Sequence, residues 1–578
     1  YQYITLSNDN ESGIHGVIIP KFTARNGSHK FRFAIDFGTT NTHIEYSVDG
    51  STSSNPFDIT EKDMQIQKLH ITDDYMINDV FNSDFIPATI GGESLYGYPM
   101  RTVISESNNT NWDKAVLAMA NVNIPYTYEK SLSLPYNVLH TDLKWSTNTE
   151  DKKRASKYIE SILLMLRTKV LLNNGDLSKT EIVWFYPASM TQNRFNKFKA
   201  EWENTFATLF GAPISNIIAA SESVAPYYYH KAKKGATSTV VSVDIGGGTT
   251  DVLIVDKGEP KYLTSFRFAA NTIFGDGYSY DSDSNGFVNK YKDIITNQLE
   301  TNNLRGLKAV LKSVLDKRVS TDVIAFLFSL ASNKEIKKEK VEINFAKMLA
   351  DDNRGKYVVI LFYVAIVYHI AKLMKAKGFD MPRHMTFSGN GSKVLNILST
   401  NDATLVRLTK IIFEEIYAQS YSIDGLDIIR PANSKESTCK GGIILTPFQS
   451  QDYGEIKDMK TILIGTDNEK FADVHMTYND VTEADLDSVV DVIKEYIEFT
   501  FKLDKKFSFY DNFDVDRSIM NKVKDLCYRD IRTYLENGLA IKKSEIAQDG
   551  ADDNLEETLF FYPLVGIINA VVRNIYQM

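Results

Sequence analysis

Residues 244–251 have the sequence Asp-Ile-Gly-Gly-Gly-Thr-Thr-Asp, and mostly apolar runs stand on both sides of them, at 240–243 and 252–255. These runs predict two strands, and the glycines between them predict a tight turn that joins the strands into a hairpin. Three consecutive glycines cost conformational entropy, so they indicate a backbone that must approach a ligand closely. A P-loop is excluded, because no Gly-Lys-Ser or Gly-Lys-Thr leads into a helix at this point.

The same pattern occurs earlier in the chain, where residues 36–41 have the sequence Asp-Phe-Gly-Thr-Thr-Asn. Strand-like runs again flank the turn, at 31–36 and 43–47. In both copies an aspartate ends a strand and can present its carboxylate to a hydrated magnesium ion. Threonine hydroxyls and backbone N–H groups of the turns can bind phosphate oxygens. Two copies separated by 208 positions fit two lobes of one fold better than a solenoid.

The two hairpins resemble the phosphate-binding hairpins of the superfamily that includes actin, the 70-kDa heat-shock chaperones, bacterial actin homologues and the sugar kinases. Three further segments follow in that superfamily's order. Residues 221–227 resemble its first connecting helix, 387–393 its adenosine-binding turn, and 436–445 its second connecting helix. The hairpins are closer in form to the chaperones than to actin or the sugar kinases. The resemblance covers roughly residues 31–450 and implies that ATP or ADP is held with Mg²⁺ between two lobes.

The expected fold is therefore α/β, a two-lobed actin-like ATPase fold of duplicated RNase H-like domains. It should have helical insertions and a mixed, mostly helical C-terminal extension. In the extension, Thr482 and Asp485 predict a capping box that begins a helix. The expected parts are an N-terminal segment, a first lobe with the first hairpin and connecting helix, a second lobe with a helical subdomain near 285–380, and the extension. Their expected bounds are 1–30, 31–237, 238–450 and 451–578.

The resemblance also implies roles for individual residues. Asp36 and Asp244 would hold magnesium through water, while Glu222 and Asp251 would position the metal shell or the attacking water. Lys144 is the candidate, by rough position, for the lysine with which the chaperones orient that water. The residues expected to surround the phosphates and the nucleoside are Gly38, Thr39, Thr40, Asn41, Gly246, Gly247, Gly248, Thr249, Gly275, Gly389, Asn390, Gly391 and Lys393.

Three functions follow from this superfamily. The first is a slow ATPase that acts as a chaperone-like switch on a protein partner by rotating its lobes. The alternative is a bacterial actin-like filament or cytoskeletal ATPase that assembles with itself. A small-molecule kinase ranks last, because no further aspartate is well placed as a base. The residues after about 455 lack the pattern of a β-rich peptide-binding domain, which weakens the chaperone hypothesis.

Composition excludes several other classes. A net charge of −9 argues against a nucleic-acid partner. The two cysteines, Cys439 and Cys527, exclude a disulfide framework or a thiolate metal site and favour a reducing, cytoplasmic location. The apolar run at 357–371 contains His369 and is shorter than the about 20 residues of a spanning helix, so no membrane span is expected. His43, just after the first turn, is expected to point outward from its strand.

Overall fold

A computed structural model gives the fold of the chain. Most of the expected N-terminal segment and residues 451–475 of the expected extension lie outside the part that it describes. The described residues are 4–7, 14–18, 27–64, 89–92, 97–107, 122–123, 137–140, 143–144, 149–187, 190, 192–234, 239–278, 285–422, 425–431, 434–445, 476–549, 555 and 557–578.

The first lobe is built on a sheet in the order β11-β10-β3-β4-β5, with β6 also paired to β4. Its first two strands in sequence, β3 and β4, are antiparallel, while β10 and β11 run parallel to β3. The strand bounds are β3 (Phe31–Phe37), β4 (Asn41–Val48), β5 (Asn55–Pro56), β6 (Met100–Arg101), β10 (Glu181–Tyr186) and β11 (Ile217–Ser221).

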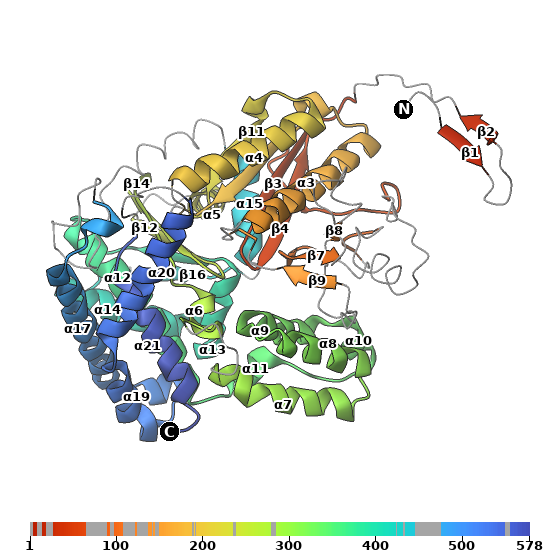
Figure 1. The fold of residues 1–578 in the computed structure, drawn as a ribbon. Coiled ribbons are helices and arrows are strands. Elements are labelled where there is room, and N and C mark those ends of the chain that lie inside the picture. The colour runs from red at the N-terminus through yellow and green to blue at the C-terminus, as the bar shows by residue number, and fades with distance from the viewer. Residues whose placement is uncertain are drawn as a thin grey trace.

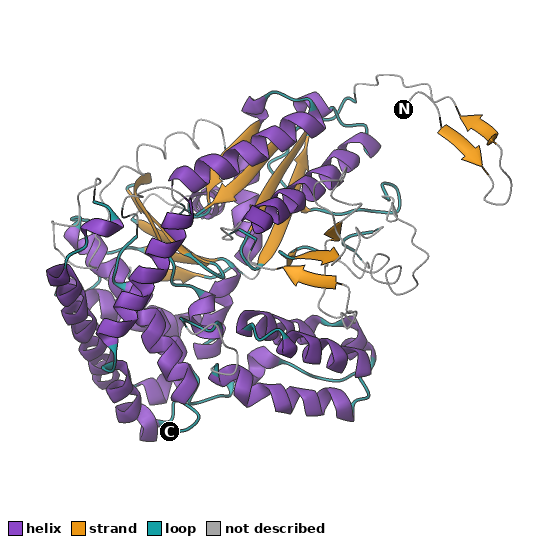
Figure 2. Ribbon diagram, viewed as in Figure 1, coloured by secondary structure: helices purple, strands orange, loops and turns teal. Residues whose placement is uncertain are grey.

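The second lobe is built on a sheet in the order β14-β13-β12-β15-β16. Figure 2 shows the strands of both lobes in orange, surrounded by helices in purple. Here β12, β13 and β14 are successively antiparallel, and β15 and β16 run parallel to β12. The bounds are β12 (Val240–Ile245), β13 (Thr250–Asp256), β14 (Glu259–Phe266), β15 (His384–Ser388) and β16 (Asp427–Ile429). Strand order and directions match those of the first sheet, so the predicted duplication of the α/β architecture is confirmed.

Two small sheets accompany these lobes. β7 (Ile104–Ser107) pairs with β8 (Val122–Asn123) and β9 (Asn137–His140) beside the first lobe. β1 (Ile4–Ser7) and β2 (Ile14–Ile18) form an antiparallel hairpin that lies apart from the lobes (Figure 1).

Alternation along β3 determines how the first lobe is layered. Phe31, Phe33, Ile35 and Phe37 point to one face and share a core with the long helices α3 (Thr149–Leu172) and α4 (Gln192–Phe210). Ala34 points to the opposite face and belongs to a different core. Successive residues of a strand face opposite sides of a sheet, so the aromatic face fixes α3 and α4 on one side.

Two helices connect the lobes, α5 (Val224–Lys234) and α15 (Ser434–Ile444). They share a core with side chains of both sheets, among them Phe185 of the first and Leu253 of the second. Their backbones pack closely, because a Cβ added to Gly441 would overlap the carbonyl oxygen of Ala225. Both segments were predicted as the connecting helices, and the structure places them between the lobes.

Helices cover the other face of the second sheet. α12 (Lys356–Ala376) and α14 (Asp402–Tyr417) pack together in a core that contains Val241, Val243 and Ile245 of β12. Within the described residues, α12 is long and apolar enough to cross a membrane, but 94% of its most apolar window is buried inside the protein. The helical subdomain is formed by α7 (Gly286–Thr301), α8 (Arg305–Asp316), α9 (Ser320–Ser329), α10 (Lys334–Lys338) and α11 (Phe345–Ala350).

The C-terminal extension is helical and packs on the second lobe (blue in Figure 1). Phe561 stacks on Phe266 of β14 with a ring-centroid distance of 4.0 Å, and the extension belongs to the same core as the second sheet. The capping box predicted at Thr482 and Asp485 is confirmed. The main helices are α17 (Glu483–Phe507), α19 (Met520–Cys527), α20 (Ile531–Asp549) and α21 (Phe561–Asn574).

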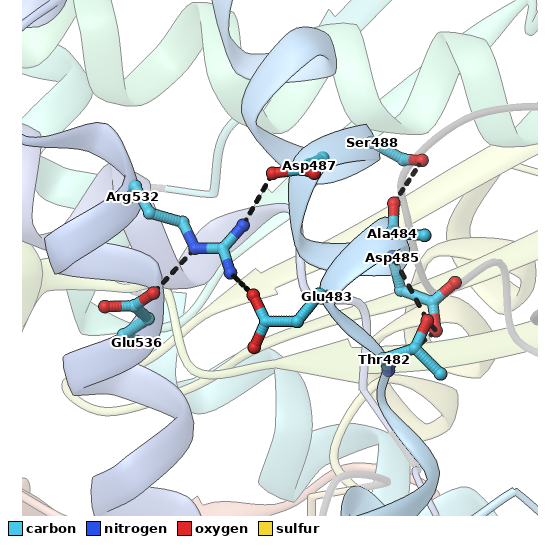
Figure 3. Close-up of polar contacts among 8 residues, drawn as sticks. All are labelled: Thr482, Glu483, Ala484, Asp485, Asp487, Ser488, Arg532 and Glu536. Atoms are coloured by element: carbon cyan, nitrogen blue, oxygen red, sulfur yellow. Dashed lines mark hydrogen bonds and ion pairs between the residues drawn. The ribbon is translucent and has the colours of Figure 1, made fainter.

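Two ionic clusters involve the extension: an exposed one joins two of its helices to each other, and a buried one contacts the second lobe. On the surface, Arg532 of α20 contacts Glu483 and Asp487 of α17 and also Glu536 (Figure 3). In the interior, Glu557 lies 3.3 Å from Lys542 and accepts a hydrogen bond from the backbone N–H of Arg267. The side chains of Glu557 and Lys542 are 1% and 5% exposed, so this pair is shielded from solvent.

Candidate functional site

A cleft of about 930 Å³ lies between the two lobes, and both contribute to its walls. It contains most of the residues that the sequence predicted for nucleotide binding. From the first lobe these are Asp36, Gly38, Thr39, Thr40, Asn41, Lys144 and Glu222, and from the second Asp244, Gly246, Gly247, Thr249, Gly389, Asn390, Gly391 and Lys393. The structure therefore brings together residues up to several hundred positions apart in sequence.

The two hairpin turns meet at the centre of this cleft. A Cβ added to Gly247 would overlap the side-chain oxygen of Thr40, so the two turns are in close contact at this point. The first turn is held by Thr102, whose hydroxyl donates to Gly38 O (2.7 Å) and whose N–H donates to Thr40 O (2.9 Å). The second is held by the N–H of Asn271, which donates to Gly247 O at 2.8 Å.

The two predicted metal carboxylates stand at corresponding positions. Asp36 and Asp244 lie near the ends of β3 and β12, are 5% and 6% exposed, and line the cleft. Asp244 Oδ2 accepts hydrogen bonds from the hydroxyls of Ser388 and Thr438, each at 3.1 Å. Thr438 belongs to the connecting helix α15, so the orientation of this carboxylate is linked to the hinge between the lobes.

Lys144 and Glu222 form an ion pair at the first-lobe wall. Their side chains are only 2% and 12% exposed. The backbone N–H of Glu222 donates to Tyr186 O at 3.0 Å, which fixes the start of the segment that leads into α5. Lys144 was a candidate by rough sequence position, and the structure places it in the cleft beside Glu222. The catalytic roles of both remain predictions.

The predicted adenosine turn packs directly on the second hairpin. Its backbone is the short 3₁₀ helix Asn390–Val394, preceded by Gly389 at φ +78°. A Cβ on Gly389 would overlap the Asp244 carboxylate, and one on Gly391 would overlap Gly246 O. Both positions therefore require glycine. The helical subdomain supplies an apolar wall to the same cleft through Ile324, Ala325, Phe328 and Ala350.

Three predicted residues lie outside the main cleft. Gly248 and Gly275 line a smaller cavity of about 340 Å³, which Thr39 and Thr40 also border. Asp251 lines neither cavity. It is buried and lies directly across the β12–β13 pair from Asp244, where cross-strand partners share one face of a sheet. Its predicted contribution to the metal shell stays a prediction.

The prediction that His43 points outward is wrong. His43 is 1% exposed, and its Nε2 atom lies 3.0 Å from the buried carboxylate of Glu45. β4 lies inside its sheet between β3 and β5, and its backbone at His43 accepts a contact from Cys439 of α15. Both faces of the strand are covered, so an outward direction does not exist here.

Sequence reasoning also missed several cleft residues. Arg101 and Asn271 line both cavities, while Ser388 and Thr438 orient Asp244. Ser388 stood in the predicted adenosine turn and Thr438 in the predicted connecting helix, so their segments were identified without their contacts. Arg101 follows a segment with no regular pattern, and nothing in the sequence would have singled it out.

Comparison with known proteins gives no match to a family model and no match among curated proteins. Among solved structures, MreB5 of Spiroplasma citri bound to AMPPNP is 13% identical, with a TM-score of 0.37, and the match covers 74% of this chain and 98% of that one. A non-polymerising mutant of MamK bound to AMPPNP is 13% identical with a TM-score of 0.32, covering 73% and 98%. The ethanolamine utilization protein EutJ from Carboxydothermus hydrogenoformans is 10% identical with a TM-score of 0.29, covering 72% and 90%.

These likenesses are low in identity and in TM-score and concern the fold. The repeated sheet topology, with two helices between the sheets and a cleft between the lobes, identifies it. The chain has the actin-like fold.

Proposed function

We propose that this actin-like protein binds ATP with Mg²⁺ in the interlobe cleft and hydrolyses it slowly. The main support for the proposal is that the hairpin turns of the two lobes, at residues 36–41 and 244–251, contact each other in that cleft. Phosphoryl transfer needs positioning and charge neutralisation more than covalent help from the protein. A site assembled from two lobes supplies both when the lobes close.

The donor set fits magnesium. Asp36 and Asp244 offer carboxylate oxygens, and Thr39, Thr40 and Thr249 offer hydroxyls, which are the hard oxygen ligands that Mg²⁺ accepts. Among the described residues, no group of three or more His, Cys, Asp or Glu could hold a metal by itself. The two aspartates would therefore hold the ion through water and together with the phosphates, for which it neutralises charge.

The remaining cleft residues would have separate roles in nucleotide binding and hydrolysis. Backbone N–H groups of the two turns would bind phosphate oxygens. Lys144, held by Glu222, would orient the attacking water, and Glu222 would accept a hydrogen bond from it. Gly389 and Gly391 let the adenosine turn lie flat against the second hairpin, and Lys393 would border the base.

We further infer that the output of the nucleotide cycle is assembly with other copies of the chain. What supports this is the architecture of the extension: its described part is helical and continuous with the second-lobe core, rather than a separate β-rich module for binding peptides. A chaperone-like switch that acts on a different protein partner is the alternative. In both cases rotation about α5 and α15 would carry the signal.

The test compares the wild-type chain with Asp244→Asn and a matched control, Asp427→Asn. Asp427 lies on β16 of the same sheet, but its side chain is 57% exposed and lines neither cavity. Calorimetry with Mg-ATP and Mg-ADP, phosphate release and sedimentation would be measured for all three. Asp244→Asn is expected to weaken Mg-dependent ATP binding on the order of 10- to 100-fold, and the control should match wild type.

The outcomes separate the hypotheses. A folded wild-type chain that binds neither nucleotide would overturn the proposal. Binding with sedimentation that depends on ATP supports self-assembly. Binding with slow phosphate release but no sedimentation at any nucleotide state would favour the switch that acts on another protein.

A further inference from the structure

An ion pair joins the two lobes beside the phosphate hairpins. Arg101 Nη2 of β6, in the first lobe, lies 2.9 Å from Asp322 Oδ1 of α9, in the helical subdomain of the second. The two side chains are 12% and 7% exposed. Two such residues, 221 positions apart, cannot be linked by local sequence, and their contact exists only because the lobes face each other.

The backbone of Arg101 is attached to the first phosphate turn. Arg101 is the direct cross-strand partner of Asn41, the residue that ends the turn. The next residue, Thr102, forms two hydrogen bonds with that turn, to Gly38 O and Thr40 O. The guanidinium therefore starts from a strand that is fixed relative to the predicted phosphate site.

The side chain of Arg101 also borders both cavities. It lines the main cleft with Thr39, Thr40 and Gly247, and it lines the smaller cavity with Asp322. A guanidinium at this boundary can reach a carboxylate on one side or a phosphate on the other. Carboxylates and phosphates each present two oxygen atoms that an arginine side chain can bind in a bidentate manner.

We propose that Arg101 distinguishes ATP from ADP by binding the terminal phosphate, and that Asp322 competes for the same guanidinium and thereby latches the lobes. This inference rests on the proposed function and adds a specificity residue to it. With ADP, the charge that would draw Arg101 away from Asp322 is missing, so the pair persists. With ATP, the terminal phosphate competes with the carboxylate, and Arg101 exchanges its contact with Asp322 for a contact with the nucleotide between the lobes.

Desolvation makes the competition strong. Breaking a buried ion pair by removing one of its members costs much free energy. Removal of Asp322 takes away the carboxylate that competes with the phosphate for Arg101, and removal of Arg101 leaves the negative charge of Asp322 near the phosphates, where it repels them. The two substitutions have opposite expected effects on ATP binding, which a purely structural ion pair would not produce.

The experiment measures Kd for Mg-ATP and Mg-ADP by calorimetry on wild type, Arg101→Gln, Asp322→Asn and the double variant. Loss of a charge-assisted bidentate contact should weaken ATP binding of Arg101→Gln roughly 10- to 100-fold. Asp322→Asn should tighten ATP binding several-fold, and ADP affinity should change less than about twofold in both. The double variant should bind ATP more tightly than Arg101→Gln alone, because the carboxylate that repels the phosphates is gone.

Arg101→Lys guards against misfolding, because it keeps the charge and loses only the forked geometry. It should melt like wild type and bind ATP more weakly. Equal losses of ATP and ADP affinity in Arg101→Gln, or weaker ATP binding in Asp322→Asn, would overturn the assignment while leaving the nucleotide site intact. A wild-type chain that binds neither nucleotide would overturn both this inference and the proposed function.

Discussion

The two lobes have the same sheet topology, but different sets of helices pack on their sheets. In the first lobe α3 and α4 cover the outer face and close a core of their own. In the second lobe α12 and α14 cover the equivalent face, and the helices of the extension add a further layer that joins the same core. The hairpin of each lobe is short and local, so the aspartate, a glycine and the two threonines of its turn occur in both copies. The stability of each lobe comes instead from helices remote in sequence.

The difference has a consequence for the site. The extension reaches the small cavity beside the two hairpin turns, where Val565 of α21 forms part of the wall. Glu557 also holds the backbone of Arg267, directly after β14. The second hairpin therefore depends on residues of the extension more than 300 positions away, whereas the first hairpin depends on its own lobe and on the connecting helix α15.

Phe561→Ala is the strongest test of this dependence. It removes a ring that stacks on Phe266 (4.0 Å) and packs on Phe268 (4.7 Å), at an expected cost of about 3–5 kcal/mol. Phe266 is paired with Thr250 at the end of the second hairpin, so Mg-ATP affinity should fall as well. Urea unfolding and calorimetry would measure the two effects.

The control for this prediction is Tyr510→Ala. Tyr510 lies in the same extension but is 45% exposed, so its loss should change the free energy of unfolding by less than about 0.5 kcal/mol. Wild-type stability in Phe561→Ala would show that the extension is an independent layer, and the contrast between the lobes would be lost.

The dependence of stability on pH compares a buried ion pair in the extension, which packs on the second lobe, with a buried ion pair in the first lobe. Burial alone would raise the pKa of Glu557, but the nearby Lys542 and Arg267 charges bring it below its ordinary value of 4.5. A lowered carboxyl pKa gives stability that is present above the unfolded-state pKa and is lost as the pH falls through the folded-state pKa. Glu557→Gln should therefore cost about 3 kcal/mol at neutral pH, and the difference from wild type should shrink below pH 4.5.

The first-lobe counterpart is Asp63, which pairs with Lys169. Burial would raise the pKa of Asp63, but hydrogen bonds from Lys169, Thr60 and Asn173 lower it from 3.8. The cost of Asp63→Asn should then begin to fade only below pH 3.8, whereas that of Glu557→Gln begins to fade below pH 4.5. Urea midpoints recorded between pH 3 and 7 would measure this, and fading in the reverse order would contradict the prediction.

Arg532→Gln should have the smallest effect. Arg532 contacts three carboxylates (Figure 3), but they are 53–86% exposed and it is itself 29% exposed. Solvent screens such pairs, so the loss should be about 0.2–1 kcal/mol with no change in nucleotide affinity. Thermal melts in low and high salt would measure this loss of stability. A loss as large as that of Glu557→Gln would mean that the surface cluster contributes as much to the stability of the extension as the buried cluster does.

Sequence predicted the parts of this molecule that are local. The turns at Asp36 and Asp244, the glycines of the adenosine turn and the cap at Thr482 are each decided within a few residues, and the structure has all of them. Connecting segments were identified by their order along the chain. These features fixed the α/β duplication and most of the cleft.

What sequence could not predict are contacts between segments brought together by folding. Arg101 and Asp322 meet across two lobes, and Thr438 reaches Asp244 from a helix that follows it by almost 200 positions. His43 was misassigned because burial of β4 depends on α15, far along the chain. Such positions have ordinary local patterns, and their role appears only with the tertiary arrangement.

The close contact between Gly441 and Ala225 has a mechanical meaning. At this point the two helix backbones approach each other with no side chain of residue 441 between them, so one helix can turn slightly against the other there without a change of side-chain rotamer. A bulky residue at position 441 would fill the space between α5 and α15 and hinder this movement. A variant locked in one conformation in this way could be used to select antibodies that recognise that conformation in the wild-type protein.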